Sequence, residues 1–268
     1  MKIAFFVNRD IHANVALNHL KHVLQDHDVS LFFSDKVGHA PGHETLDILR
    51  LIEQDIPNEH VYPGVDEPGE LLSFTELGRR FAMPLETVHQ PNDPAFIERL
   101  GVLAPDLVIS IRYGRIFKDA FIAVPGLGVL NLHSGLLPSY RGVLATLQAL
   151  LAGDDEIGCT LHFILDATID TGPIVDEARV PVDANGSLFG HVLSLYEPGA
   201  RLVEKAIATL MAGEALDTRP KTPDAGNYFT FPTAEELVRF ASLGYPVFKA
   251  SEYRSLLARY RRAPLGLG

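Results

Sequence analysis

The chain opens with a strand, a helix and a second strand, and this order constrains its fold more than any other feature. Residues 2–7 form an apolar run of strand length, residues 13–24 carry apolar side chains at helical spacing, and residues 29–33 form a second strand-like run. Such an order favours a parallel sheet whose strands are joined by a right-handed crossover. We therefore expect an α/β protein.

Similar runs continue along most of the chain. We predict further strands at residues 106–111, 126–132, 159–165 and 174–182, and helices at 46–52, 70–81, 94–100, 144–151 and 188–210. Pro198-Gly199 is expected to break or kink the last of these helices. The predicted fold is a Rossmann-like, mostly parallel sheet with helices on both faces.

The composition changes after Gly213. A linker rich in Pro, Gly and Thr is expected at residues 217–226, then a strand-like run at 228–231 and two short helices at 234–241 and 251–260. This stretch is too small for an independent hydrophobic core. We therefore expect a domain over residues 1–213 and a small C-terminal appendage over residues 214–268.

The charge composition narrows the choice of partners. The chain has 34 acidic and 23 basic residues and a net charge of -11, which argues against a nucleic-acid partner because Lys and Arg dominate phosphate binding. We see no apolar stretch long enough for a signal peptide or a membrane span, so we expect a cytoplasmic protein without a membrane partner. The eleven histidines are scattered without metal-ligand spacing, and the single cysteine, Cys159, is expected to be a buried structural thiol.

Three polar side chains stand where a site is expected. Asn131 and His133 come at the end of a predicted strand, where ligands gather in open parallel sheets, and their two-residue spacing places both on one side. Asp170 precedes a Thr-Gly-Pro turn that would hold its carboxylate in a loop, with Asp166 as a weaker competitor. Each feature alone is more typical of a structural hydrogen bond or turn. Together, an amide, an imidazole and a carboxylate could move an acyl group onto an amine.

The order and spacing of several motifs resemble the folate-dependent formyltransferases. The motifs are Leu136-Leu137-Pro138, Tyr140-Arg141-Gly142, the Gly-Cys-Thr-Leu-His-Phe run at 158–163 and Asp170-Thr171-Gly172-Pro173. The resemblance covers residues 1–182. It implies 10-formyltetrahydrofolate as co-substrate, no metal, a primary amine as acceptor, and Asn131, His133 and Asp170 as the catalytic residues.

The resemblance also implies where the folate binds. Residues 106–117 match the segment whose end lines the pterin pocket in the family, with a strand residue beneath the ring and an acidic loop closing over it. The expected folate-binding residues are Arg115, Ile116, Phe117, Val129, Asp166 and Asp170.

The turn after the first strand bears on the acceptor. In the glycinamide ribonucleotide enzymes this turn is rich in glycine and cradles a phosphate, whereas residues 8–14 contain no glycine. The methionyl-tRNA formyltransferases carry a longer, basic C-terminal domain. We therefore expect a nucleotide-linked amino sugar or a similarly small amine. The expected acceptor-site residues are Asn8, Arg9, Asp10, His12, Asn14, Tyr140 and Arg141.

Several alternatives stay open. The acceptor could be glycinamide ribonucleotide or a hydroxyornithine-type amino acid, and a formyltetrahydrofolate hydrolase would share the same three catalytic side chains. Asp10 and Asn14 could simply cap the first helix. Dinucleotide binding is not expected, because no Gly-x-Gly-x-x-Gly follows the first strand. In amino-sugar relatives the appendage often mediates dimerisation, so a homodimer is compatible with this sequence.

Overall fold

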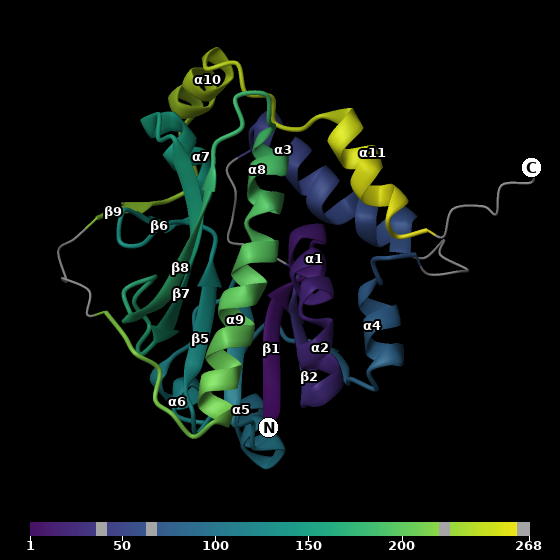
Figure 1. Cartoon of the computed structure of the whole chain (residues 1–268), viewed down its shortest axis with the longest axis vertical. Helices are drawn as coiled ribbons and strands as arrows, with labels where there is room; N and C mark the ends of the chain where they lie inside the picture. Colours follow the sequence, from purple (N-terminus) through teal and green to yellow (C-terminus); the bar gives the residue numbers. More distant parts are fainter. Residues whose placement is uncertain (36–41, 63–68, 220–225, 262–268) are drawn as a thin grey trace, which may run out of the picture.

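The computed structural model describes residues 1–35, 42–62, 69–219 and 226–261 (Figure 1). Within these ranges the larger sheet has seven strands in the order β3-β2-β1-β4-β5-β7-β8. The first five strands in this order, β3, β2, β1, β4 and β5, pair in parallel, and β7 is antiparallel to its neighbours β5 and β8. The strands are β1 (Lys2–Asn8), β2 (Asp28–Ser34), β3 (Leu85–Thr87), β4 (Leu107–Ile111), β5 (Val129–His133), β7 (Glu156–Ile164) and β8 (Ile174–Pro181). The predicted α/β class with a mostly parallel sheet is confirmed.

Helices cover both faces of this sheet (Figure 1). Because successive strand residues point to opposite faces, Phe5 and Val7 join the larger core while Phe6 joins the smaller one. The larger core contains residues of α1 (Ile11–His19), α2 (Lys21–Asp26), α8 (Leu188–Ser194) and α9 (Tyr196–Met211). The smaller core contains residues of α5 (Pro94–Leu103) and α6 (Asp119–Ile122). The described helices are all too short or too polar to cross a bilayer.

Two predicted helices are divided in the structure. The first is split at Leu20, between α1 and α2. The second was expected to break at Pro198-Gly199, but it divides at Leu195, between α8 and α9. Pro198 lies in the first turn of α9, where a backbone N–H has no partner inside the helix and its loss therefore costs little.

An irregular helical segment follows β2. The α-helix α3 (Glu44–Arg50) continues into the wider π-helical turns η1 (Leu51–Asp55) and η2 (Pro57–Val61), and α4 (Phe74–Arg80) comes after a break. Helical periodicity of the apolar side chains marks α3 and α4, but it does not reveal the π turns. The η1 turn places the side chain of Glu53 in the interior of the protein.

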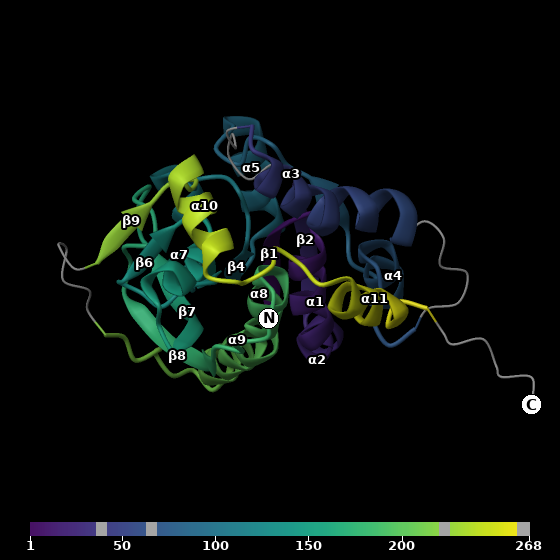
Figure 2. The same cartoon turned by 90° about the horizontal axis from the view of Figure 1, so that it is seen from above.

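The segment after Gly213 packs onto the rest of the protein. Its strand β9 (Asn227–Phe229) pairs in parallel with β6 (Tyr140–Gly142). Figure 2 shows α10 (Ala234–Ser242) near α7 (Ala145–Ala152). The helix α11 (Ala250–Ala258) lies against η1, because the Tyr253 hydroxyl donates to the carbonyl oxygen of Ile52 at 2.8 Å. The predicted linker includes residues 220–225, which lie outside the described residues. The boundary between residues 213 and 214 remains a prediction. The larger core takes up five side chains from this segment, Leu237, Phe240, Tyr253, Leu256 and Tyr260.

Candidate active site

The end of β5 is paired with β7, and this pairing fixes the orientation of Asn131. Asn131 stands opposite His162, and its Nδ2 lies 3.1 Å from His162 Nε2. His162 Nδ1 lies 2.9 Å from the carbonyl oxygen of Phe163, which can only accept, so Nδ1 is the donor in that contact. In a neutral ring Nε2 then accepts from the Asn131 amide. No pattern in the sequence distinguishes His162 as a site residue, although it lies in the run at 158–163.

Asp170 lies between two imidazole rings. Its Oδ2 is 3.6 Å from His133 Nδ1, and its Oδ1 is 3.5 Å from His162 Nε2. The backbone N–H of Gly142 donates to Oδ2 at 2.8 Å. Asp170 has a φ of 54°, in the left-handed region that Asp tolerates better than most side chains. The structure thus brings the three predicted catalytic residues, Asn131, His133 and Asp170, together around His162.

The electrostatics of this cluster favour a charged carboxylate. Burial alone raises the pKa of the Asp170 carboxyl, but His133, His162 and the Gly142 N–H more than offset it and hold the pKa well below its ordinary value. His133 Nε2 lies 2.7 Å from the carbonyl oxygen of Tyr140, so this nitrogen is the donor. The other ring nitrogen, Nδ1, is the one that faces Asp170.

The loop between β5 and β6 is held close to His133. The fully buried Thr160 hydroxyl donates to the carbonyl oxygen of Gly135 at 2.7 Å and accepts from the N–H of Leu137 at 3.1 Å. A Cβ at Gly135 would lie 2.8 Å from His133 Nε2 and 2.9 Å from the Tyr140 carbonyl oxygen. Glycine is therefore needed at this position to leave room for the imidazole.

The segment expected to bind folate follows β4. Ile116 is 49% exposed, and its carbonyl oxygen accepts a hydrogen bond from Asn92 Nδ2 at 2.8 Å. Arg115 is half-buried, and no described residue accepts a hydrogen bond from its Nε. Phe117 and Val129 are buried in the smaller core, so their side chains pack inside the protein and do not lie on its surface. The described part of the segment therefore offers one apolar contact surface and one buried donor.

The acidic loop separates the two candidate aspartates. The exposed Asp166 carboxylate accepts hydrogen bonds from the backbone and hydroxyl of Thr168, whereas Asp170 reaches the two imidazole rings. The Thr168 contacts lower the pKa of Asp166. This geometry favours Asp170 over Asp166 as the carboxylate that acts on His133.

Most of the residues expected at the acceptor site lie in the interior. Asp10 caps α1, because its Oδ1 accepts from the N–H of Ala13 at 2.8 Å. Arg9 is exposed, and its guanidinium lies 5.2 Å from the ring centre of Phe33. The fully buried members of the set are Asn8, Asp10, His12 and Asn14.

The two members of this set on β6 are half-buried. The Tyr140 hydroxyl donates to Asp154 Oδ2 at 2.6 Å. Arg141 stands opposite Tyr228 of β9, and no described residue accepts a hydrogen bond from its Nε. The tyrosine hydroxyl is therefore already engaged within the protein.

A buried ionic cluster lies beside the ends of β1 and β4. Arg112 Nε donates to Asp10 Oδ2 at 2.7 Å, and Arg112 Nη2 donates to Glu53 Oε2 at 2.6 Å. His12 Nδ1 lies 3.5 Å from Glu53 Oε1. Burial raises the pKa of Glu53, but Arg112 and His12 outweigh it and lower the pKa overall. No pattern in the sequence links Glu53 and Arg112, because they come from segments far apart in the chain.

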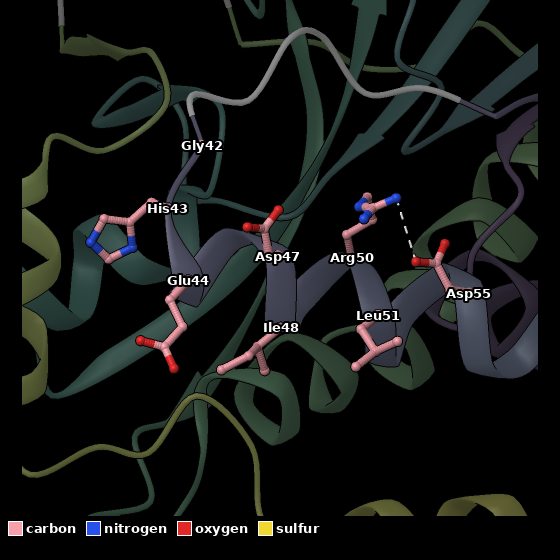
Figure 3. Close-up of a pocket in the computed structure, with 8 residues that line it drawn as sticks. All are labelled: Gly42, His43, Glu44, Asp47, Ile48, Arg50, Leu51 and Asp55. Carbon is pink, nitrogen blue, oxygen red and sulfur yellow. Dashed lines mark ion pairs between the residues drawn. The ribbon is translucent and has the colours of Figure 1, made fainter.

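A surface pocket of about 510 Å³ lies elsewhere, along α3 and η1 (Figure 3). It contains an ion pair in which Arg50 Nη1 and Asp55 Oδ2 are 3.4 Å apart. Its lining residues are Gly42, His43, Glu44, Asp47, Ile48, Arg50, Leu51 and Asp55. The cluster around Asp170 shares none of these described residues, so we do not assign the reaction to this pocket. The described residues also contain no group of His, Cys, Asp or Glu side chains suited to a metal ion.

Comparison with known proteins identifies similar sequences and folds. A methionyl-tRNA formyltransferase of Mycolicibacterium gilvum is 37% identical over 132 residues, which cover 48% of this chain and 41% of the relative. One of Herpetosiphon aurantiacus is 32% identical over 177 residues, 66% of this chain and 55% of the relative. The matched segments thus span about half the length of these relatives.

Solved structures share the fold at low sequence identity. The sugar 3N-formyl transferase WlaRD has a TM-score of 0.56 at 19% identity, covering 85% of this chain and 69% of its own. Glycinamide ribonucleotide transformylase 1 from Symbiobacterium toebii has a TM-score of 0.58 at 21% identity, covering 83% of this chain and 94% of its own. Residues 1–190 match the Formyl transferase family. This match covers more than half of the chain and includes Asn131, His133, His162 and Asp170, and the chain therefore belongs to the formyl transferase family.

Proposed function

We propose that the protein transfers a formyl group from 10-formyltetrahydrofolate to a primary amine of a small molecule. The observation that carries this proposal is the Asp170 carboxylate between His133 and His162, with Asn131 at the same end of β5. Family membership supports formyl transfer as the reaction class.

Each of the three side chains has a chemical role in this proposal. The Asn131 amide donates a hydrogen bond to the oxyanion that develops when an amine attacks a formyl carbon. His133 takes the proton that the attacking nitrogen loses and passes it to the folate nitrogen as the bond between that nitrogen and the formyl carbon breaks. Asp170 stabilises the positive charge that this proton places on the His133 ring.

The folate would supply the formyl group. The half-exposed Ile116 side chain suits the apolar face of a pterin, and the buried Nε of Arg115 suits a polar acceptor atom. One structural neighbour was solved in the presence of 5-N-formyl-THF, which supports a folate for this family member as well. These observations fit the predicted folate segment.

For the acceptor we propose a nucleotide-linked amino sugar. A helix N-terminus can bind phosphate through free backbone N–H groups, but Asp10 occupies that end of α1 with its own carboxylate. This arrangement disfavours a ribonucleotide phosphate there. Structural neighbours that include sugar N-formyltransferases, and the net charge of -11, support the same choice. We also propose a cytoplasmic location and a homodimer.

A second candidate acceptor is charged initiator tRNA. Relatives that are 32% to 37% identical carry the name methionyl-tRNA formyltransferase, so sequence similarity favours it although the net charge does not. The described ionic cluster does not distinguish the two, because it is buried. The acceptor must therefore be tested with both classes.

The test is an acceptor panel with 10-formyltetrahydrofolate. The panel contains nucleotide-linked amino sugars, glycinamide ribonucleotide, hydroxyornithine and charged initiator tRNA, with tetrahydrofolate release and the mass of each acceptor as readouts. We expect an amino sugar to gain the formyl group most efficiently, and the Asp170→Asn variant to serve as the inactive control. A higher rate with tRNA than with every amino sugar would show that the acceptor is tRNA. Formate release without any amine would show that the protein is a formyltetrahydrofolate hydrolase.

A further inference from the structure

The segment after Gly213 contributes a strand that touches the candidate active-site loop. β9 pairs with β6, and their register places Tyr140 opposite Asn227 and Gly142 opposite Phe229. Two backbone groups of β6 contact the candidate catalytic residues, because the Tyr140 carbonyl accepts from His133 and the Gly142 N–H donates to Asp170. β9 is therefore separated from these side chains by a single strand.

The chain approaches itself closely at two glycines, Gly142 in β6 and Gly226 directly before β9. Gly142 has a φ of 95°, and a Cβ added there would overlap the carbonyl oxygen of Phe229. Gly226 has a φ of 85°, and a Cβ added there would overlap the carbonyl oxygen of Pro138. The Phe229 carbonyl oxygen also accepts from the N–H of Val143 at 2.9 Å. Any larger residue at either glycine must separate β9 from the loop.

Side chains reinforce this pairing. The rings of Tyr140 and Phe229 are stacked with their centres 6.0 Å apart. The Tyr140 hydroxyl is bound to Asp154, so the tyrosine is held at its ring and at its hydroxyl. A pair of isolated strands is marginally stable in water, and β6 spans only Tyr140–Gly142. Its position therefore depends on what packs against it.

We propose that β9 is a positioning strand for the reaction: it fixes β6, and β6 in turn orients Asp170 and His133. This inference rests on the proposed function and deepens it, because it gives residues 226–229 a role in turnover. Catalytic groups tolerate little displacement, since a misplacement of about 1 Å can lower a rate by roughly a hundredfold. Loss of the β9 contact should therefore lower kcat more than it weakens folate binding.

The test uses a matched pair of glycine variants. Gly226→Ala adds a Cβ against Pro138, whereas Gly244→Ala adds one at nearly the same φ, 87° compared with 85°, with no atom within 4 Å. The two changes impose similar backbone strain, and they differ in whether β9 is pushed away. We expect Gly226→Ala to lower kcat by about tenfold or more with little change in the Kd of a folate analogue. Gly244→Ala should stay near the wild type.

A second pair of variants tests the side-chain contact. Phe229→Ala removes the ring that stacks on Tyr140, and Phe229→Tyr keeps it. We expect kcat to fall in Phe229→Ala, the pH profile of kcat to shift with it, and both to recover in Phe229→Tyr. If Gly226→Ala fails to fold, the kcat values of Phe229→Ala and Phe229→Tyr decide whether β9 has a positioning role, and an unchanged kcat in Phe229→Ala would overturn it.

A spectroscopic readout separates this inference from the proposed function. The backbone amide resonance of Gly142 and the imidazole resonances of His133 should move in Gly226→Ala and stay in place in Gly244→Ala, whether or not the protein is active. Unmoved resonances together with unchanged kcat would overturn the positioning role. If the wild type formylates no amine, the proposed function fails. The resonances of Gly142 and His133 then decide by themselves whether β9 positions these residues.

Discussion

His133 turns its Nδ1 toward Asp170 because its Nε2 lies 2.7 Å from the carbonyl oxygen of Tyr140. Since a carbonyl only accepts, Nε2 carries a proton, and a further proton taken up by the ring at Nδ1 would face the carboxylate. Replacing Asp170 with Asn keeps the shape of the side chain and removes the negative charge that would face this proton. The contact thus links the orientation of the ring to its charge.

We expect His133→Ala and Asp170→Asn each to lower formyl transfer by about a hundredfold or more, because proton transfer and its orientation supply that much. Steady-state assays with circular dichroism would measure activity and folding together. Asp166→Asn is the matched control, because this exposed carboxylate binds Thr168 and does not reach the imidazole rings. Greater loss in Asp166→Asn than in Asp170→Asn would show that the loop is misassigned.

The low pKa of Asp170 predicts a pH dependence of stability. Its carboxyl has a lower pKa in the folded protein than in the unfolded chain, so its contribution is present above the unfolded value of about 3.9 and is lost as pH falls toward the folded value. The free energy of unfolding of the wild type should therefore fall between about pH 5 and pH 3. Urea titrations should show a smaller fall for Asp170→Asn, and an equal fall would contradict the assignment.

The buried ionic cluster predicts a large loss of stability when its cation is removed. Arg112→Met would leave the carboxylates of Asp10 and Glu53 without their main partner, at a cost of about 3–5 kcal/mol in the free energy of unfolding. Arg99→Met is the control, since Arg99 pairs with Glu86 on the surface, where such pairs contribute about 1 kcal/mol or less. Urea denaturation measures both, and similar losses would show that the cluster is not buried.

The folate segment predicts a selective binding defect. Ile116→Glu should abolish the protection that a non-hydrolysable folate analogue gives against thermal unfolding, because a charge would face the apolar pterin surface. Binding of an amine ligand should persist. Leu243→Glu changes a residue of similar exposure, 45% compared with 49%, and should keep the protection. Unchanged folate affinity in Ile116→Glu would place the donor elsewhere.

The single cysteine should be inert in the folded protein. Burial raises the pKa of the Cys159 thiol to about 12, so little thiolate exists near neutral pH. We expect a thiol reagent at pH 8 to leave the native protein unmodified and to label one site per chain in denaturant. Rapid labelling of the native protein would contradict the burial of Cys159 and the structural role predicted from the sequence.

Regular elements with long apolar runs could be predicted from the sequence. β1, β4 and β5 are buried strands whose apolar residues leave little ambiguity, and α5 (Pro94–Leu103) begins at the predicted residue 94. The short strand β6 could not be predicted, because its three half-buried residues are ordered by a partner distant in sequence. The π turns η1 and η2 could not be predicted either, because the pattern of apolar side chains does not distinguish them from an α-helix.

The candidate site shows the same division. Asn131 and His133 share a strand, so their spacing predicts that both side chains lie on one side of the sheet. His162 is opposite Asn131 only because β7 runs antiparallel to β5 in one register, and a sequence does not state the register. Asn8 and Asp10 were expected at the acceptor site from their place after β1, but burial and the distant Arg112 give them internal partners. Their role in binding an acceptor stays a prediction.

The pairing of β6 with β9 also has a consequence for the order of folding. The strands from β1 to β5 can assemble from residues 2–133, whereas β6 gains its partner only when residues 227–229 arrive. A chain made from its N-terminus can therefore pair β1 to β5 before residues 227–229 exist. In a nascent chain the parallel part of the sheet should form before His133 and Asp170 reach their final geometry, and protection from proteolysis should precede turnover.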